Sequence, residues 1–210
     1  MTPEALPRKA GRGLIICVSG PSGVGKGSII ARIRELNPAI AHSVSVTTRQ
    51  PRPDEVEGVS YYFRKPEEFL SMLEKGEILE YDKYCQNYYG TPRTPLDNMV
   101  NQGTDVIMDI TVPGSLAVMA NYPEVITIFL MPPSFTELQR RLSKRGTDHP
   151  DVVAARMANA THEIRQAEKF QYVVVNDDID TTAKRILCII EAERCRYSYM
   201  KGIEDQVLEL

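Results

Sequence analysis

Short apolar runs alternate with segments of helical spacing along most of the chain. The apolar runs are nearly continuous and only a few residues long, which is typical of strands buried on both faces of a parallel sheet. They are residues 14–18, 106–110, 125–130 and 172–175, with 43–46 as a further candidate. The helical segments are 29–36, 92–102, 135–142, 152–169 and a last one that runs through Arg194. This alternation predicts an α/β fold with a parallel sheet that is covered by helices on both faces.

One long segment departs from this alternation. Residues 47–96 are rich in proline, tyrosine and charge, and they contain short alternating pieces such as Ser60-Tyr61-Tyr62-Phe63. We therefore expect a small inserted α+β lobe there, within one domain overall. The expected core consists of 13–46, 97–142 and 159–196, with tails at 1–12 and 197–210.

Composition narrows the class of protein. The chain has 210 residues, of which 42% are hydrophobic and 25% charged, which suits a globular domain. The net charge of -3 argues against a nucleic-acid-binding protein, whose binding surface would be basic. The longest apolar run, 125–131, is too short to span a membrane, and residues 1–12 lack the apolar part of a secretory signal. Four cysteines without a CxxC pair predict free thiols in a reducing cytosol and argue against a metal site.

The sharpest motif follows the first predicted strand and opens the first predicted helix. Its glycines allow the backbone to wrap closely around a phosphate, and the helix N-terminus adds partial positive charge. Its lysine would reach the β- and γ-phosphates of a nucleotide. The motif predicts that ATP is bound by Gly20, Pro21, Ser22, Gly23, Val24, Gly25, Lys26, Gly27 and Ser28.

One position of this loop departs from the general pattern G-x-x-x-x-G-K-[ST]. Gly27 stands where a serine or threonine usually supplies a hydroxyl to Mg²⁺, and Ser28 comes one residue later. Two arrangements stay open: Mg²⁺ is held mainly by waters and phosphates, which it tolerates, or Ser28 contributes indirectly. We therefore assign no direct metal ligand and keep Ser28 and Asp109 as candidates that act through water.

A second candidate phosphate site lies in the proline-rich segment 47–55. Arg49 and Arg52 are three residues apart, and guanidinium groups match phosphate oxygens in pairs. The prolines stiffen the segment, so less ordering entropy is lost on binding. On these residues alone, a solvated basic loop explains the pattern equally well.

Several motifs in a fixed order make the chain resemble the guanylate kinase family over about residues 13–194. They are the glycine-rich loop, the segment 45–55, Glu80, Asn87-Tyr88-Tyr89-Gly90-Thr91, Arg141-Leu142-Ser143-Lys144-Arg145-Gly146-Thr147 and Val175-Asn176-Asp177-Asp178. Each motif is weak alone, but together they are specific. The resemblance implies a P-loop nucleoside monophosphate kinase with a parallel sheet core, an inserted GMP-binding lobe at 47–96 and a lid at 143–158.

The resemblance also implies which residues bind the acceptor. Guanine presents N1–H and its N2 amine side by side, so one carboxylate can accept from both, whereas adenine would leave that carboxylate badly paired. Without the resemblance, a charged strand end would explain Glu80, and edge packing would explain the two tyrosines. The implied guanine readers are Ser45, Glu80 and Thr91, the implied phosphate clamp is Arg49, Arg52, Tyr61 and Tyr89, and Glu55 and Asp109 belong to the same GMP site.

By the same similarity, Arg141, Arg145 and Arg156 belong to the lid that closes over ATP. Their charges would neutralise the transferring phosphoryl group, and closure would exclude water. Asn176 would lie beside the adenine, although Asn-Asp after a strand is by itself an ordinary turn and helix cap. The expected catalytic residues are Lys26, Arg145, Arg156 and Arg141.

The implied reaction is direct in-line transfer of the γ-phosphoryl group of ATP to GMP, with Mg²⁺ as cofactor. ATP and GMP are the expected partners, without nucleic acid or membrane, in the cytosol; the oligomeric state stays open. One alternative is a kinase of the same architecture for another phosphorylated acceptor, such as a sugar phosphate, against which Glu80, Tyr89 and Thr91 argue. The other is a guanylate-kinase-like module that binds proteins without catalysis, against which Lys26 and the lid arginines argue.

The chain departs from the family after its strand 106–110. The family usually has two acids around one apolar residue and then an apolar-Gln-Gly step, where this chain has Asp109-Ile110-Thr111-Val112-Pro113-Gly114. Strand alternation predicts that Asp109 and Thr111 lie on the same side of the strand. We expect Asp109 alone to keep the acidic role toward GMP or hydrated Mg²⁺, unless Thr111 is an ordinary strand-end residue and the change is silent.

Overall fold

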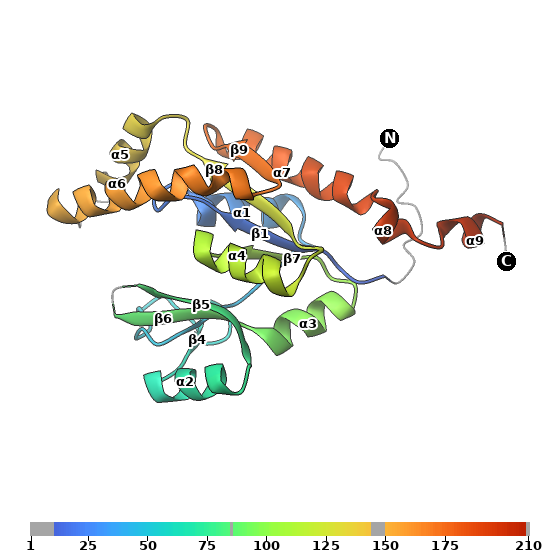
Figure 1. The fold of residues 1–210 in the computed structure, drawn as a ribbon, viewed down its shortest axis with the longest axis horizontal. Coiled ribbons are helices and arrows are strands. Elements are labelled where there is room, and N and C mark those ends of the chain that lie inside the picture. The colour runs from blue at the N-terminus through green and yellow to red at the C-terminus, as the bar shows by residue number, and fades with distance from the viewer. Residues whose placement is uncertain (1–10, 85, 144–149, 209–210) are drawn as a thin grey trace.

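A five-stranded parallel sheet forms the centre of the computed structural model, which describes residues 11–84, 86–143 and 150–208 (Figure 1). Its strand order is β2-β7-β1-β8-β9, and each neighbouring pair runs parallel. The apolar runs of the sequence thus form the predicted sheet. The strands are β1 (Ile15–Ser19), β2 (Ala41–His42), β7 (Val106–Asp109), β8 (Ile126–Met131) and β9 (Tyr172–Val175).

Successive residues of β1 pack on opposite faces of this sheet. Ile16 and Val18 lie in one apolar core with side chains of α1 and α7, whereas Ile15 and Cys17 lie in a second core with side chains of α3 and α4. Since helices cover both faces, every residue of β1 is buried, which explains its continuous apolar run. These helices are α1 (Lys26–Leu36), α3 (Arg93–Asn101), α4 (Val112–Asn121) and α7 (Ile179–Arg194).

A smaller sheet forms a lobe beside the core (Figure 1). Its strand order is β4-β3-β6-β5, and α2 (Pro66–Glu74) packs on it through Phe69, which contacts Val46 and Ile78 in a separate apolar cluster. The lobe is thus α+β, as its composition predicts. Its strands are β3 (Val46–Thr47), β4 (Tyr62–Phe63), β5 (Ile78–Tyr84) and β6 (Asn87–Pro92).

Two helices extend over the sheet on the side away from this lobe (Figure 1). They are α5 (Phe135–Ser143) and α6 (Pro150–Arg165), which continues into the 3-10 helix η1 (Gln166–Lys169). Leu138 and Leu142 of α5 pack against Met157 and Ala160 of α6. The chain ends in two short helices, α8 (Tyr197–Met200) and α9 (Ile203–Val207), where the sequence indicated a tail.

The structure corrects the strand expected at 43–46. β2 ends at His42, and Val46 already belongs to β3 of the small sheet, so Ser43, Val44 and Ser45 connect the two sheets. A short alternating pattern indicates an extended chain, but it does not say which sheet that chain joins.

The structure also corrects the position of Thr111. β7 ends at Asp109, and Thr111 is the N-cap of α4, a helix that we did not predict; its Oγ1 accepts a hydrogen bond of 3.2 Å from the N–H of Gly114. Pro113 lies in the first turn, where a helix needs no N–H donor. Strand alternation therefore does not apply to Thr111, because β7 ends at Asp109, but both residues line the same cleft.

Candidate active site

The phosphate loop connects β1 to α1. Gly20, Gly23 and Gly25 have φ values of 148°, 86° and 102°, which favour glycine. The ammonium of Lys26 donates to the carbonyl oxygen of Gly20 at 3.1 Å and so bridges the two ends of the loop. The loop therefore presents a helix N-terminus and a lysine together, as phosphate binding requires.

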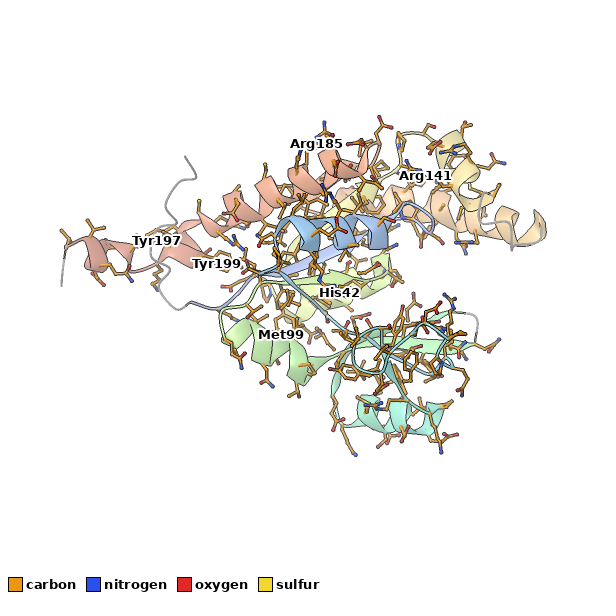
Figure 2. All side chains as sticks on the ribbon, turned by 180° about the vertical axis from the view of Figure 1, so that it is seen from behind. His42, Met99, Arg141, Arg185, Tyr197 and Tyr199 are labelled. Atoms are coloured by element: carbon orange, nitrogen blue, oxygen red, sulfur yellow. The ribbon has the colours of Figure 1, made fainter. Side chains whose placement is uncertain are left out.

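The β9 side of the molecule holds the same loop through a single carbonyl oxygen. Asn176 Nδ2 donates to the Val24 oxygen at 2.7 Å, and Arg141 Nη1 donates to it at 3.1 Å. Arg141 also donates to the Asn176 carbonyl at 3.1 Å and pairs with Glu137 at 2.8 Å. Figure 2 shows Arg141 on the side of the core away from the small lobe. In this conformation Arg141 supports the loop, and its catalytic role stays a prediction.

A cleft of about 500 Å³ lies between the phosphate loop and the small lobe. The loop contributes Lys26 and its glycine neighbours, and the ends of the core strands contribute His42 and Asp109. The lobe contributes Tyr61, Glu80 and Tyr89, and the connection between the two sheets contributes Ser45. One cavity thus joins residues predicted for ATP with residues predicted for GMP.

Asp109 ends β7 beside the first turn of α1. A Cβ at Gly27 would lie 3.9 Å from Asp109 Oδ2, so a side chain at this position would contact the carboxylate. His42 pairs in register with Ile107, two residues before Asp109, and therefore lies on the same face. Burial raises the pKa of Asp109, and the charge of Lys26 opposes this rise, as does His42 when it is protonated; burial lowers the pKa of His42. The cleft thus contains an acid whose ionised form depends on neighbouring cations.

Glu80 is a buried carboxylate on β5, with 6% of its surface exposed. The hydroxyl of Thr91, its partner in register on β6, donates to Glu80 Oε1 at 2.6 Å. Burial raises the pKa of Glu80, and the hydrogen bond from Thr91 opposes this rise. The carboxylate is therefore fixed in place and can accept adjacent N–H groups from a ligand in the cleft.

Arg49 lies among aromatic rings at the edge of the lobe. Its guanidinium carbon is 5.5 Å from the ring centre of Tyr61, whose ring centre is 6.0 Å from that of Tyr89. Arg49 Nη2 lies 2.7 Å from Glu55 Oε1, and this hydrogen bond raises the pKa of Arg49 and lowers that of Glu55. Glu55 also accepts the backbone N–H of Arg52 at 2.8 Å, while Arg52 itself lies exposed. The structure thus brings Arg49, Tyr61 and Tyr89 together and leaves Arg52 on the surface of the same loop.

Two side chains of the helix α6 form hydrogen bonds with Ser22 of the phosphate loop. Arg156 Nη2 donates to Ser22 Oγ at 2.8 Å, and Glu163 accepts the backbone N–H of Ser22 at 3.2 Å. The expected catalytic residue Arg145 lies outside the described residues. Of the lid predicted at 143–158, the structure describes Ser143 and residues 150–158, which form the start of α6. Arg156 from this part contacts the phosphate loop.

The described part of the chain shows neither a cluster of metal ligands nor a membrane-spanning helix. Within residues 11–84, 86–143 and 150–208, no group of three or more His, Cys, Asp and Glu side chains is placed to hold a metal ion. None of the described helices is long and apolar enough to cross a membrane.

Sequence reasoning missed several polar residues of the site, among them His42 and Glu163. His42 reaches the cleft because its short strand lies beside β7, and Glu163 reaches Ser22 across 141 positions of the sequence. Neither residue stands in a motif that we interpreted. A strand pairing and a helix contact, which are tertiary features, place both.

Comparison with known proteins gives a consistent result. The model of the guanylate kinase family matches residues 12–193. Guanylate kinases of Lactococcus lactis and Halalkalibacterium halodurans are 47% and 45% identical to this chain, over 88% and 95% of it and over 90% and 98% of their own lengths. The crystal structure of guanylate kinase from Anaplasma phagocytophilum superposes with a TM-score of 0.72 at 37% identity, covering 90% of this chain and 89% of that one. Since sequence and fold agree over nearly the same span, the chain belongs to the guanylate kinase family.

Proposed function

We propose that this chain transfers the γ-phosphoryl group of ATP to GMP, giving ADP and GDP, in the cleft between the phosphate loop and the small lobe. Membership of the family supports an ATP:GMP phosphotransferase. The observation that carries the assignment of the site is that Lys26 and Glu80 line one cavity of about 500 Å³. A kinase needs such a cavity because its main task is to position two anionic substrates and to neutralise their repulsion.

ATP binds at the phosphate loop in this proposal. Backbone N–H groups of residues 20–28 and the ammonium of Lys26 hold the phosphates. Asn176 is buried, and its Oδ1 has no hydrogen-bond partner among the described residues. Its Nδ2 donates to the Val24 oxygen of the phosphate loop, and this contact with the loop supports the position of the adenine beside β9.

GMP binds on the lobe side in this proposal. Glu80 accepts N1–H and the N2 amine of guanine, and Ser45 and Thr91 complete the recognition. Arg49, Tyr61 and Tyr89 hold the phosphate, and Arg52 turns in when the nucleotide binds. Arg156 and Arg145 then neutralise the transferring group while the lid excludes water.

Mg²⁺ fits this site as a nucleotide-bound ion. It would neutralise charge on the β- and γ-phosphates. Gly27 offers no hydroxyl, but the carboxylate of Asp109 faces the same turn of α1, and Ser28 lines the cleft. These two residues would hold the ion through water, as Mg²⁺ readily allows. The free thiols of Cys17, Cys188 and Cys195 support a reducing compartment, the cytosol, as the place of the reaction.

A coupled assay of ADP release tests the proposal. We expect GMP to be the best acceptor, dGMP a weaker one, and AMP, CMP and UMP to be far poorer. Glu80→Ala should raise the KM for GMP and narrow the preference over AMP, whereas Glu77→Ala, an exposed acid before the same strand, should change neither. AMP as the better substrate of the unaltered protein would contradict the guanine assignment.

The same assay distinguishes GMP phosphorylation from the two alternative functions, a kinase for another phosphorylated acceptor and a protein-binding module without catalysis. A kinase for a sugar phosphate would release ADP with that acceptor and not with GMP. A protein-binding module would release no ADP with any acceptor. The intact loop with Lys26 bonded to Gly20 favours the kinase over the module.

A further inference from the structure

Gly114, the third residue of α4, lies against the carboxylate of Glu80. A Cβ built on Gly114 would be 2.5 Å from Glu80 Oε2 and 3.2 Å from Glu80 Cδ. The first distance is far shorter than the separation at which non-bonded heavy atoms attract each other. Both residues are buried, so the carboxylate has little room to give way.

Space, rather than backbone conformation, requires a glycine here. Gly114 has no positive φ, and it lies in the first turn of a helix, where alanine is the better helix former. The chain therefore carries a residue that weakens α4 at a point where this helix meets Glu80.

The surroundings fix the carboxylate from two sides. Thr91 donates to Oε1, while Oε2 faces the bare Cα of Gly114, whose own N–H is used by Thr111 Oγ1. We propose that Gly114 is a positioning residue for guanine recognition: it lets α4 lie against Glu80 and so sets where the carboxylate meets the guanine edge. This inference rests on the proposed function, because it deepens the role of Glu80.

A methyl group at this position displaces the carboxylate and leaves the ATP side unchanged. In Gly114→Ala we expect the KM for GMP to rise about tenfold or more and the KM for ATP to stay within about twofold. Ser115→Ala is the matched control, because Ser115 is the next buried residue and its hydroxyl has no hydrogen-bond partner in the described part of the chain. It should leave both constants unchanged.

A double-mutant cycle distinguishes positioning from general damage. In a Glu80→Ala background, Gly114→Ala should not raise the KM for GMP further, and it should raise Tm by about 2 °C because alanine favours the helix. With Glu80 present, the same change should lower Tm. An equal rise in KM in both backgrounds, or an unchanged KM for GMP in Gly114→Ala, would overturn the proposal.

The crystal structure of Gly114→Ala gives a readout that does not depend on activity. A displaced Glu80 carboxylate that has lost the hydrogen bond from Thr91 supports the inference, and an unmoved carboxylate overturns it. Absence of GMP phosphorylation by the unaltered chain would refute the proposed function instead, and this structure would still decide whether Gly114 positions Glu80.

Discussion

Lys26 is the cation of the phosphate loop, and its ammonium is bonded to the loop itself rather than to the core. In Lys26→Ala we expect turnover to fall about a hundredfold or more, because a preorganised charge at the transferring group is lost. Thermal unfolding should change little, and Lys75→Ala at the exposed end of α2 should change neither property. Near-normal turnover in Lys26→Ala would remove this lysine from the mechanism.

Glu80 makes GMP binding dependent on pH. Burial raises its pKa above the ordinary value of 4.5, so the carboxyl becomes protonated at a higher pH than a free glutamate does. Only the ionised form accepts both N–H groups of guanine. The KM for GMP should therefore rise as the pH falls, and this rise should begin above pH 4.5.

Glu80→Gln isolates this effect from the titration of Asp109, whose pKa burial also raises. In this variant the KM for GMP should be high at every pH. It should not show the rise at low pH that the protonation of Glu80 causes. An identical pH profile in the two proteins would show that the ionisation of Glu80 does not control binding.

Asp109 ends β7 with a carboxylate in the cleft, whereas Thr111 is the N-cap of α4. Asp109→Asn should reduce turnover severely, because it removes the carboxylate that faces the start of α1. Thr111→Asp should fold normally, because aspartate is as good an N-cap as threonine, and it should change the Mg²⁺ concentration for half-maximal rate. Full activity of Asp109→Asn would exclude this strand end from the active site.

At the scale of elements, α6 connects the lid region to the phosphate loop through Ser22. In Arg156→Ala we expect kcat to fall about tenfold or more, since this arginine contacts the loop and, in the proposed function, neutralises the transferring group. Arg165→Ala, at the exposed end of the same helix, is the matched control and should keep full activity. Steady-state rates at saturating ATP and GMP measure both. An unchanged kcat in Arg156→Ala would limit its role to packing.

The observed helices and strands show which elements the pattern of apolar residues predicts correctly. The short apolar runs and the helical segments were predicted in the right order, because burial on both faces of a sheet leaves a nearly continuous apolar run. The helix α4 was missed, because Pro113 and Gly114 weaken the local helical signal. Its first turn is shaped by the contact with Glu80, which comes from another element.

At the scale of the whole molecule, the proposed function assigns ATP and GMP to different parts of the structure. Each ligand that binds the folded state raises Tm, by several degrees at a hundredfold excess over Kd for a chain of this size. Lys26→Ala should lose most of the shift caused by ATP and keep the shift caused by GMP, and Glu80→Ala should show the reverse. Thermal scans with each nucleotide alone measure this, and loss of both shifts in one variant would contradict two separate sites.

The sequence also predicted much of the cleft itself. Lys26, Ser45, Tyr61, Glu80, Tyr89 and Asp109 were named from motifs, and all line one cavity. Their roles toward ATP and GMP stay predictions. Arg141 was expected at the transferring group, but in this conformation it holds Val24 and Asn176, since a motif does not specify where a long side chain points.

The sequence by itself determined the class of fold, the phosphate loop and the family. These depend on local patterns: apolar runs, glycines that need special φ values and the spacing of a lysine. Only the tertiary structure decided which sheet Val46 joins, that His42 lies beside Asp109, and that Gly114 must lack a side chain because Glu80 occupies the space. Such features depend on contacts between residues far apart in the chain, and these contacts leave no local pattern.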